Sequence, residues 1–389
     1  MVSLARRVTD TSTKSYGMYE QALRLEKSGV DLIHLEFGRP VHDTPDHIKQ
    51  AAADALFAGH VHYGDMRGDP AFRQAIAEKL RTFNRIDASP DEILVTNGLT
   101  QGSYAAFMAL INPWDEVILL DPYYPQHLGK IELAGGKIVT VPLDRDNGFS
   151  IRADWIEAAI TRATRMIVLV NPANPTGRVY SHAELSALAD IAIRHDLMVV
   201  SDEVYEYITF DNASHISIAS LPGMKERTIS LFAFTKAYAM DGWRLGYTVA
   251  DASLMPGLLK ISTSAVTHVN SFIQYGGLAA LTGPQEPMEA MVVDDRKKRD
   301  MVVQGLNQLP GVSCPSPEGT IYAFPDIRGT GMTSQQLADR LLNEAHVVVE
   351  AGSFYGSGGE GHLRVCFGSQ TSEQLEEALV RISHFFNTI

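Results

Sequence analysis

The sequence predicts an α/β protein with two parts. The first is a large domain with a mostly parallel, seven-stranded sheet covered by helices on both faces, and the second is a smaller α+β domain. Two observations carry this prediction. Across residues 92–250, short continuous apolar runs alternate with helical patterns, which is typical of parallel strands buried on both faces. Beyond the breaker-rich stretch 283–287, a long charged helix and several short strands follow. The predicted division is 1–45 for the N-terminal arm and part of the small domain, 46–284 for the large domain, and 285–389 for the C-terminal small domain.

The composition limits what the protein can bind. Its 389 residues are 45% hydrophobic and 20% charged, which is ordinary for a soluble globular protein. The formal net charge is −13 and aspartates flank the basic run 297–299, so we expect no nucleic-acid partner and no membrane partner. Two cysteines, Cys314 and Cys366, are too few for a disulfide framework and lack the spacing of a zinc site. The polar start lacks the apolar core of a signal peptide, so we expect a cytoplasmic protein.

Residues 1–91 predict helices and one short strand. The predicted elements are a helix over 16–27, a strand over 32–36, a helix over 46–57, a polar loop over 60–69 and a helix over 71–83. Gly29 ends the first helix, and Gly38-Arg39-Pro40 breaks the strand. Thr44 is a candidate N-cap, and Pro45 would take the first helical position of the next helix.

The alternating region supplies the large sheet. Its predicted strands are 93–96, 117–120, 137–141, 166–170, 198–201, 229–234 and 245–250, with one edge strand a candidate for antiparallel pairing. The predicted helices between them are 100–111, one after Tyr124, 152–161 and 181–195. The C-terminal part is predicted to hold helices over 288–309, 334–345 and 372–386, and strands over 321–324, 347–350 and 363–367.

Chemical groups gather where the predicted strands end. Ligands of open parallel sheets bind beyond the carboxyl ends of the strands, so these side chains form the candidate site. The turn 96–102 opens a helix, whose first amides and dipole favour an anion such as phosphate. The other groups are the ring of Tyr124, the amide of Asn174, the carboxylate of Asp202, the phenol of Tyr205, the amine of Lys236 and the guanidinium of Arg244. Each has an ordinary explanation as a turn residue, a helix cap or packing, but a flat phosphorylated pyridine aldehyde would use all of them together.

Lys236 is the candidate nucleophile. It stands at the end of an apolar run and eight residues before Arg244. A lysine that leaves an apolar strand is poorly solvated, which favours the uncharged amine that can attack a carbonyl.

Four motifs, in their order and spacing, resemble the fold-type I, pyridoxal-phosphate-dependent aminotransferases of class I/II, particularly the bacterial aspartate and aromatic branch. The motifs are Asn171-Pro-Ala-Asn-Pro-Thr-Gly177, Asp202-Glu-Val-Tyr205, Thr235-Lys236 with Met240-Asp-Gly-Trp-Arg-Leu-Gly246, and His362-Leu-Arg-Val365. The resemblance covers nearly the whole chain. It implies an enzyme that moves the amino group of an L-α-amino acid to a 2-oxo acid, and it makes 46–284 the cofactor-binding domain.

The resemblance also implies which residues contact pyridoxal phosphate. Lys236 would form a Schiff base with its aldehyde and then act as the base for the proton shift. Asp202 would pair with the protonated pyridine nitrogen, while Asn174 and Tyr205 would hold the phenolate oxygen. Tyr124 would stack on the ring. Lys236, Asp202 and Tyr205 are thus the implied catalytic residues. The implied phosphate contacts are Leu99, Thr100, Arg244 and Tyr63, and Thr235, next to the lysine, is a further cofactor-binding residue.

Substrate and partner contacts follow from the same resemblance. Arg364 would clamp the substrate α-carboxylate through a bidentate fork, with Asn174 and Gly38 beside it. Tyr63 matches a tyrosine that reaches the phosphate of the neighbouring subunit, which implies a homodimer with shared active sites. His127 resembles a histidine that supports the pyridine-binding aspartate in some members.

Several positions depart from the family pattern or extend it. Ala233 stands three residues before the lysine, where a phosphate-binding hydroxyl is often found. Thr100 occupies the turn position where bacterial aspartate enzymes of this branch can have a lysine, so a dicarboxylate preference does not follow. Arg39, Arg67 and His268 lie in loops expected to face the cleft. Each is a candidate for binding the substrate side chain and equally for an interface salt bridge.

Other functions fit these motifs less well. The run 356–361 looks like a dinucleotide loop, but no strand–turn–helix unit surrounds it. A non-catalytic regulator would need a DNA-binding module and a basic patch. The alternative that stays open is another carbanion reaction on the same cofactor, such as β-elimination or a lyase or cyclase step on an unusual amino acid. The same core residues serve all of these reactions, so the sequence does not separate them.

Overall fold

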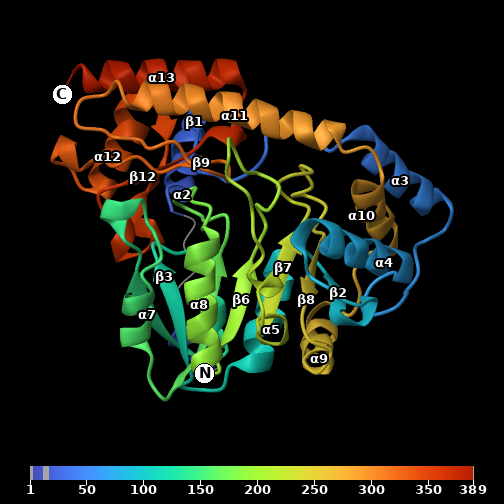
Figure 1. The fold of residues 1–389 in the computed structure, drawn as a ribbon. Helices are drawn as coiled ribbons and strands as arrows, with labels where there is room; N and C mark the ends of the chain where they lie inside the picture. Colours follow the sequence, from blue (N-terminus) through green and yellow to red (C-terminus); the bar gives the residue numbers. More distant parts are fainter. Residues whose placement is uncertain (1–2, 12–16, 389) are drawn as a thin grey trace.

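The centre of the molecule is a seven-stranded sheet with the strand order β2-β8-β7-β6-β5-β3-β4 (Figure 1). This computed structural model describes residues 3–11 and 17–388. The strands are β2 Ile93–Thr96, β3 Glu116–Asp121, β4 Lys137–Pro142, β5 Thr164–Val170, β6 Met198–Asp202, β7 Thr228–Ala233 and β8 Gly246–Val249. The sheet is mostly parallel and helices cover both of its faces, so the fold class predicted from the sequence is confirmed.

One strand of the sheet runs against the others. β8 pairs antiparallel with both β2 and β7, whereas the pairs from β7 through β4 are parallel. The sequence predicts the antiparallel strand at an edge, and its actual place is one position inside. The connection between β7 and β8 explains this arrangement. Its residues, 234–245, contain no helix, whereas two neighbouring parallel strands need a longer crossover, usually a helix.

Strand β3 shows why this sheet is buried on both faces. Val117 and Leu119 point into one hydrophobic core, and Ile118 and Leu120 point into another. Successive side chains of a strand alternate between the two faces, so a run without polar residues must be covered on both sides.

Two sets of helices provide that cover. Helices α7 (Ala153–Ala159) and α8 (His182–Arg194) lie together over one face, in front of the strands in Figure 1. Helices α5 (Leu99–Leu110), α6 (Pro125–Leu133) and α9 (Met255–Val266) pack on the other face.

A third helical group lies beside the β2 edge. It consists of α3 (Asp46–Phe57), α4 (Pro70–Lys79) and α10 (Ser271–Thr282). The sequence did not predict α9 or α10. In α10 the reason is the adjacent Gly276 and Gly277, which disfavour an isolated helix. Close packing requires them here, because a Cβ at Gly276 would lie 2.7 Å from Trp243 and one at Gly277 would lie 2.5 Å from Leu245.

The two ends of the chain come together in a second α+β group. Strand β1 (Ile33–His34) pairs in parallel with β10 (Val347–Val348). The antiparallel set β11-β12-β9 spans Glu350–Ala351, Leu363–Cys366 and Tyr322–Ala323. The helices are α2 Tyr19–Glu26, α11 Glu286–Leu306, α12 Ser334–Arg340 and α13 Ser372–Phe386, whereas the short helix α1 (Arg6–Thr9) contacts α6 instead. Tyr16, the predicted start of α2, lies outside the described residues, and the domain boundaries at 45/46 and 284/285 stay predictions.

The longest helix, α11, has 21 residues and carries many charges. Among the described residues, no helix is both long and apolar enough to cross a membrane.

Candidate active site

A cavity of about 770 Å³ opens beyond the carboxyl ends of the strands. Eleven of the twelve predicted site residues line it: Gly38, Leu99, Thr100, Tyr124, Asn174, Asp202, Tyr205, Thr235, Lys236, Arg244 and Arg364. The twelfth, Tyr63, does not line it. The fold therefore brings residues that are up to 326 positions apart in the chain, from Gly38 to Arg364, to one place.

Lys236 follows β7, which the sheet holds by pairing on both sides. Its side chain is half-buried, and its Nζ donates a hydrogen bond to the backbone oxygen of Gly38. The same Nζ lies 5.9 Å from the centre of the Tyr205 ring. The amine therefore stands inside the cavity, between the sheet and the N-terminal segment.

Asp202 ends β6 and is only 2% exposed. Its Oδ2 lies 3.0 Å from His127 Nε2, and its Oδ1 accepts a hydrogen bond from the amide of Val204 at 3.3 Å. Burial lowers the pKa of His127, although the hydrogen bond with Asp202 acts in the opposite direction. The imidazole is thus a neutral donor that holds the carboxylate in place.

Arg364 lies in strand β12 and is 7% exposed. Its Nη1 donates to Asn174 Oδ1 at 3.1 Å, and its Nη2 donates to the backbone oxygen of Glu36. Its guanidinium carbon lies 4.2 Å from the ring centre of Tyr322 and 4.8 Å from that of Tyr355. Within the described residues, its Nε has no hydrogen-bond partner. A buried cation with a donor left over is equipped to bind a carboxylate.

Tyr322 was not predicted from the sequence. Its hydroxyl lies 2.8 Å from the Tyr205 hydroxyl, and a Cβ at Gly38 would come within 1.9 Å of it. Tyr322 therefore contacts three predicted site residues, including Arg364 through its ring. Its position in a short strand is typical of a core aromatic residue, so nothing in the sequence distinguishes it as a site residue from a residue that only packs in the core.

The turn before α5 forms an anion cradle. Gly98 has φ +75°, and a Cβ there would lie 2.6 Å from Arg244 Nη2. A Cβ at Gly246 would lie 3.1 Å from the Leu99 amide nitrogen. Only glycine permits both approaches, which bring an arginine up to the amides that open a 12-residue helix. This combination fits a phosphate.

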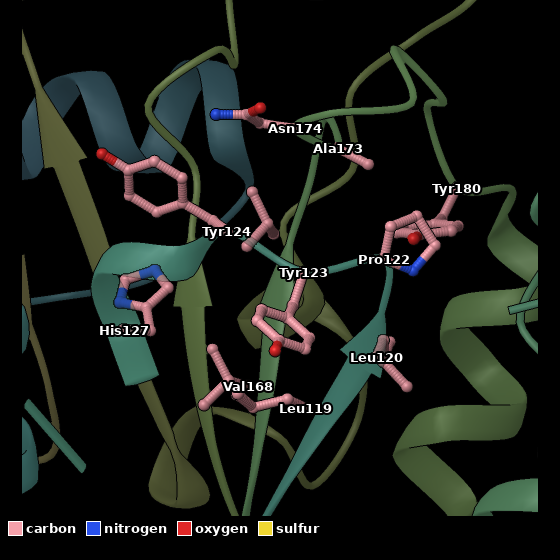
Figure 2. Close-up of a pocket in the computed structure, with 11 residues that line it drawn as sticks. Leu119, Leu120, Pro122, Tyr123, Tyr124, His127, Val168, Ala173, Asn174 and Tyr180 are labelled. Atoms are coloured by element: carbon pink, nitrogen blue, oxygen red, sulfur yellow. The ribbon is translucent and has the colours of Figure 1, made fainter. Parts of the chain in front are cut away.

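Tyr124 forms one wall of the cavity, and Figure 2 shows its ring with Asn174 and His127 on either side. The Tyr124 and His127 rings meet edge-on with their centres 5.3 Å apart. Behind them is a small cavity of about 20 Å³, lined by apolar side chains from β3 and β5 (Figure 2). Burial raises the pKa of Tyr124, so its hydroxyl stays protonated.

The remaining candidates lie at the rim or outside. Arg39 lines the cavity and is exposed. Arg67 forms an ion pair with Asp91, with an Nη1–Oδ1 distance of 2.8 Å, and does not line the cavity. His268 Nε2 accepts a hydrogen bond from the Gly64 amide at 3.0 Å. Of these three side chains, Arg39 is the one placed to meet a substrate.

The arrangement fits pyridoxal phosphate. The cradle at Gly98 can take the phosphate, the buried Asp202 can face a protonated ring nitrogen, and Lys236 can reach an aldehyde. Fold and site together define the class: a cofactor-dependent enzyme of the open α/β type that acts on a carboxylate substrate.

Comparison with known proteins identifies the family. The model for "Aminotransferase class I and II" matches residues 30–382, and the chain belongs to this family. It is a pyridoxal-phosphate-dependent transferase that moves an amino group between an amino acid and a 2-oxo acid. Another carbanion reaction on the cofactor, the alternative left open by the sequence, is not favoured.

Three relatives show how closely the chain follows this family. It is 39% identical to the aspartate aminotransferase of Musicola paradisiaca, covering 94% of this chain and 92% of the relative. It is 37% identical to the arginine–pyruvate transaminase AruH of Pseudomonas aeruginosa, covering 97% and 96%. The crystal structure of an aromatic aminotransferase from Pyrococcus horikoshii superposes with a TM-score of 0.90 at 38% identity, covering 95% of this chain and 98% of that one.

Proposed function

We propose that this aminotransferase works through Lys236, and that Arg364 would bind the substrate α-carboxylate while Asp202 would pair with the ring nitrogen of the cofactor. One observation carries the proposal: Lys236 and the buried Arg364 line the same cavity, together with Gly38, whose backbone oxygen accepts a hydrogen bond from the lysine amine. An amino acid bound between them has its α-carbon within reach of the amine and its carboxylate on the arginine.

Lys236 moves the proton in this scheme. When bound, pyridoxal phosphate supplies an aldehyde for the amino group and an electron sink for the pair left behind by the α-proton. Lys236 Nζ would accept the proton from the substrate α-carbon and could donate it again. Its place in the turn three residues after β7, which is paired on both sides, would hold the amine in position for this transfer.

Asp202 keeps the ring nitrogen protonated. Its carboxylate is buried and lines the cavity, with the neutral His127 fixing one oxygen and the Val204 amide donating to the other. A carboxylate in this buried position stabilises a protonated ring nitrogen more than a neutral hydrogen-bond acceptor would. Asn174 and Tyr205 hold the phenolate oxygen, and Tyr124 packs against the ring.

The phosphate is held by the cradle before α5. Arg244, Thr100, Thr235 and the amide of Leu99 supply positive charge and donors. Ala233 offers no hydroxyl, so these groups carry the binding together with Tyr63 from a second subunit. Tyr63 is 79% exposed and does not line the cavity of its own chain, which supports a role in a partner's site.

We further propose that the protein is a homodimer. Phe57 is the last residue of α3, and Val61 and Tyr63 follow it before α4; the three are 89%, 53% and 79% exposed. Large apolar side chains that gather at one exposed place mark an interaction site. A second copy of the chain fits this place, because it would also bring Tyr63 to a phosphate cradle.

The relatives support an α-amino acid as donor without fixing its side chain. Their names include aspartate, aromatic amino acids and arginine, three side chains of different chemistry. The part these donors share is the α-amino acid group, which is the part that Lys236 and Arg364 are proposed to handle. A cytoplasmic location is consistent with Cys314 and Cys366, which are both free and buried.

The test replaces the amine. We expect Lys236→Ala to lower kcat for transamination by at least ~10²-fold, the scale of a lost general base. Purified wild-type protein should be yellow from the bound cofactor, and the visible band should change in the variant. Lys260→Ala is the matched control, because Lys260 is exposed on the surface of α9, and this variant should behave as wild type. A Lys236→Ala protein with wild-type turnover, or wild-type protein that cannot take up pyridoxal phosphate, would overturn the proposal.

The donor is found by a screen. Each amino acid is mixed with the yellow enzyme, and the loss of the visible band is followed together with the 2-oxo acid formed.

A further inference from the structure

Glu350 is a buried carboxylate next to the proposed substrate arginine. It lies in β11, directly opposite Arg364 across the antiparallel pair β11–β12. Residues paired in this way project their side chains from the same face of the sheet. Glu350 is 4% exposed and also lines the cavity.

The start of helix α2 is built around this carboxylate. Both Glu350 oxygens lie near the Met18 amide nitrogen, at 3.3 and 3.2 Å. Gly17 has φ +59°, and a Cβ there would lie 1.9 Å from Glu350 Oε2. The backbone at Gly17 can come this close only because it has no side chain. A carboxylate at the start of a helix also interacts favourably with the helix dipole.

The seating of α2 shapes one wall of the cavity. Tyr19, the first residue of α2, lines the cavity, and its ring centre lies 5.4 Å from that of Phe37, which also lines it. Met18 is 1% exposed, and its sulfur accepts a hydrogen bond from Gln335 of α12 at 3.3 Å. Glu350 is therefore connected to Arg364 on one side and to the start of α2 on the other.

The surroundings of Glu350 contain charges of both signs. Facing it are Arg364 from β12, Glu36 from the segment after β1, and the amides of Met18 and Ala351. On α12, which packs against β11, Arg340 is paired with Glu344, and Asp339 accepts from Gln335. Glu36 is itself paired with His34. Burial raises the pKa of Glu350 to about 7, although Arg364 and the two amides oppose the rise. The carboxyl group thus changes charge near neutral pH.

We propose that Glu350 is a positioning residue with two linked effects. It holds the start of helix α2 in place, and its own charge determines how much of the positive charge of Arg364 acts on the substrate. This rests on the proposed role of Arg364 in binding the substrate carboxylate. When Glu350 is neutral, the full positive charge of Arg364 faces the substrate. When Glu350 is ionised, it shares that charge and repels the incoming carboxylate, while it holds the α2 amide more firmly.

The first experiment measures KM for the amino donor against pH. In wild type, ionisation of Glu350 should raise KM as pH increases through about 7. Glu350→Gln keeps an acceptor for Met18 but carries no charge, so its KM should lack this rise. We expect the two proteins to differ by roughly three- to tenfold in KM at high pH, with similar kcat, as for one partly screened charge. Parallel KM profiles in the two proteins would overturn the proposal.

The second experiment tests whether Glu350 anchors the start of α2, and it uses variants that remove no charged residue. Gly17→Ala pushes a side chain into the Glu350 carboxylate, whereas Gly29→Ala, at φ +90° with nothing within 4 Å, controls for backbone strain in the same segment. Trypsin should cut at Arg24 in α2 several-fold faster in Gly17→Ala than in Gly29→Ala. Equal cleavage rates in the two variants would contradict the proposal that Glu350 anchors the start of α2.

These outcomes separate the inference from the proposed function. If Arg364→Ala leaves KM for every donor unchanged, the carboxylate role of Arg364 is wrong. The proteolysis comparison needs no substrate, so it reports on the Glu350 anchor alone.

Discussion

Two buried aspartates end strands of the same sheet and serve different purposes. Asp121, at the end of β3, accepts hydrogen bonds from Ser357 Oγ at 2.8 Å and the Gly358 amide at 3.0 Å. Both of its oxygens are engaged by protein donors. Asp202, at the end of β6, lines the cavity and is supported by His127. Both oxygens of Asp202 are engaged as well, by His127 and by the Val204 amide, so the difference between the two aspartates is that Asp202 lines the cavity and Asp121 does not.

This contrast predicts the behaviour of variants. We expect Asp202→Ala to lose nearly all transamination and Asp202→Glu to keep part of it, because a carboxylate is needed to hold the ring nitrogen protonated. The measurements are kcat and the visible spectrum of the bound cofactor.

Asp121→Ala is the matched control at another strand end. It should lower the free energy of unfolding by about 1–3 kcal/mol through two lost hydrogen bonds, while the cofactor spectrum keeps its band position. If Asp202→Ala retained wild-type kcat, Asp202 would not be the ring-nitrogen partner.

The residues that the sequence predicted and those that it missed differ in kind. Lys236, Asp202 and Arg364 belong to local motifs, so the sequence alone is enough to propose them, and the structure places them in one cavity. Tyr322 and Glu350 act through contacts with residues far away in the chain, and each stands in a short strand where it resembles core packing. Their roles appear only when β9, β11 and β12 pair.

At the scale of elements, periodic patterns predicted the sheet and most helices that cover it. The helices α9 and α10 were missed, and the antiparallel β8 was expected at an edge. The short link 234–245 explains the place of β8, and close packing explains α10. Gly276 and Gly277 weaken α10 as an isolated helix but let it approach Trp243 and Leu245.

Helix α13 offers a test of local stability. Thr371 Oγ1 accepts from the Gln374 amide at 3.3 Å, and Gln374 Oε1 accepts from the Thr371 amide at 3.1 Å. We expect Thr371→Ala to cost about 1 kcal/mol of stability, the usual value of an N-cap. Urea unfolding measures the cost, and kcat should not change because Thr371 does not line the cavity. Thr371→Ser keeps the hydroxyl and should recover most of the stability, and an equal loss in both variants would contradict the capping explanation.

At the scale of the whole molecule, the exposed apolar segment between α3 and α4 governs assembly in our proposal. Phe57→Glu places a charge in the proposed dimer contact and should shift sedimentation toward monomer. Cofactor retention should fall with it, because Tyr63 would no longer reach a partner's phosphate cradle.

Trp114→Glu provides the control, since Trp114 is 81% exposed and lies at the opposite end of the sheet, before β3. It should sediment as wild type. Equal sedimentation of all three proteins as monomers would contradict the proposed homodimer.

The pairing of β1 with β10 has a consequence for the order in which a newly made chain matures. Strand β8, the last of the large sheet, ends at Val249, so a ribosome that has released α10 has already made every strand around Lys236. Strand β1 must wait for Val347, and the substrate arginine arrives later still, at position 364. Since domains generally fold as units with N-terminal regions first, the site around Lys236 is assembled before the arginine that is proposed to hold the substrate carboxylate.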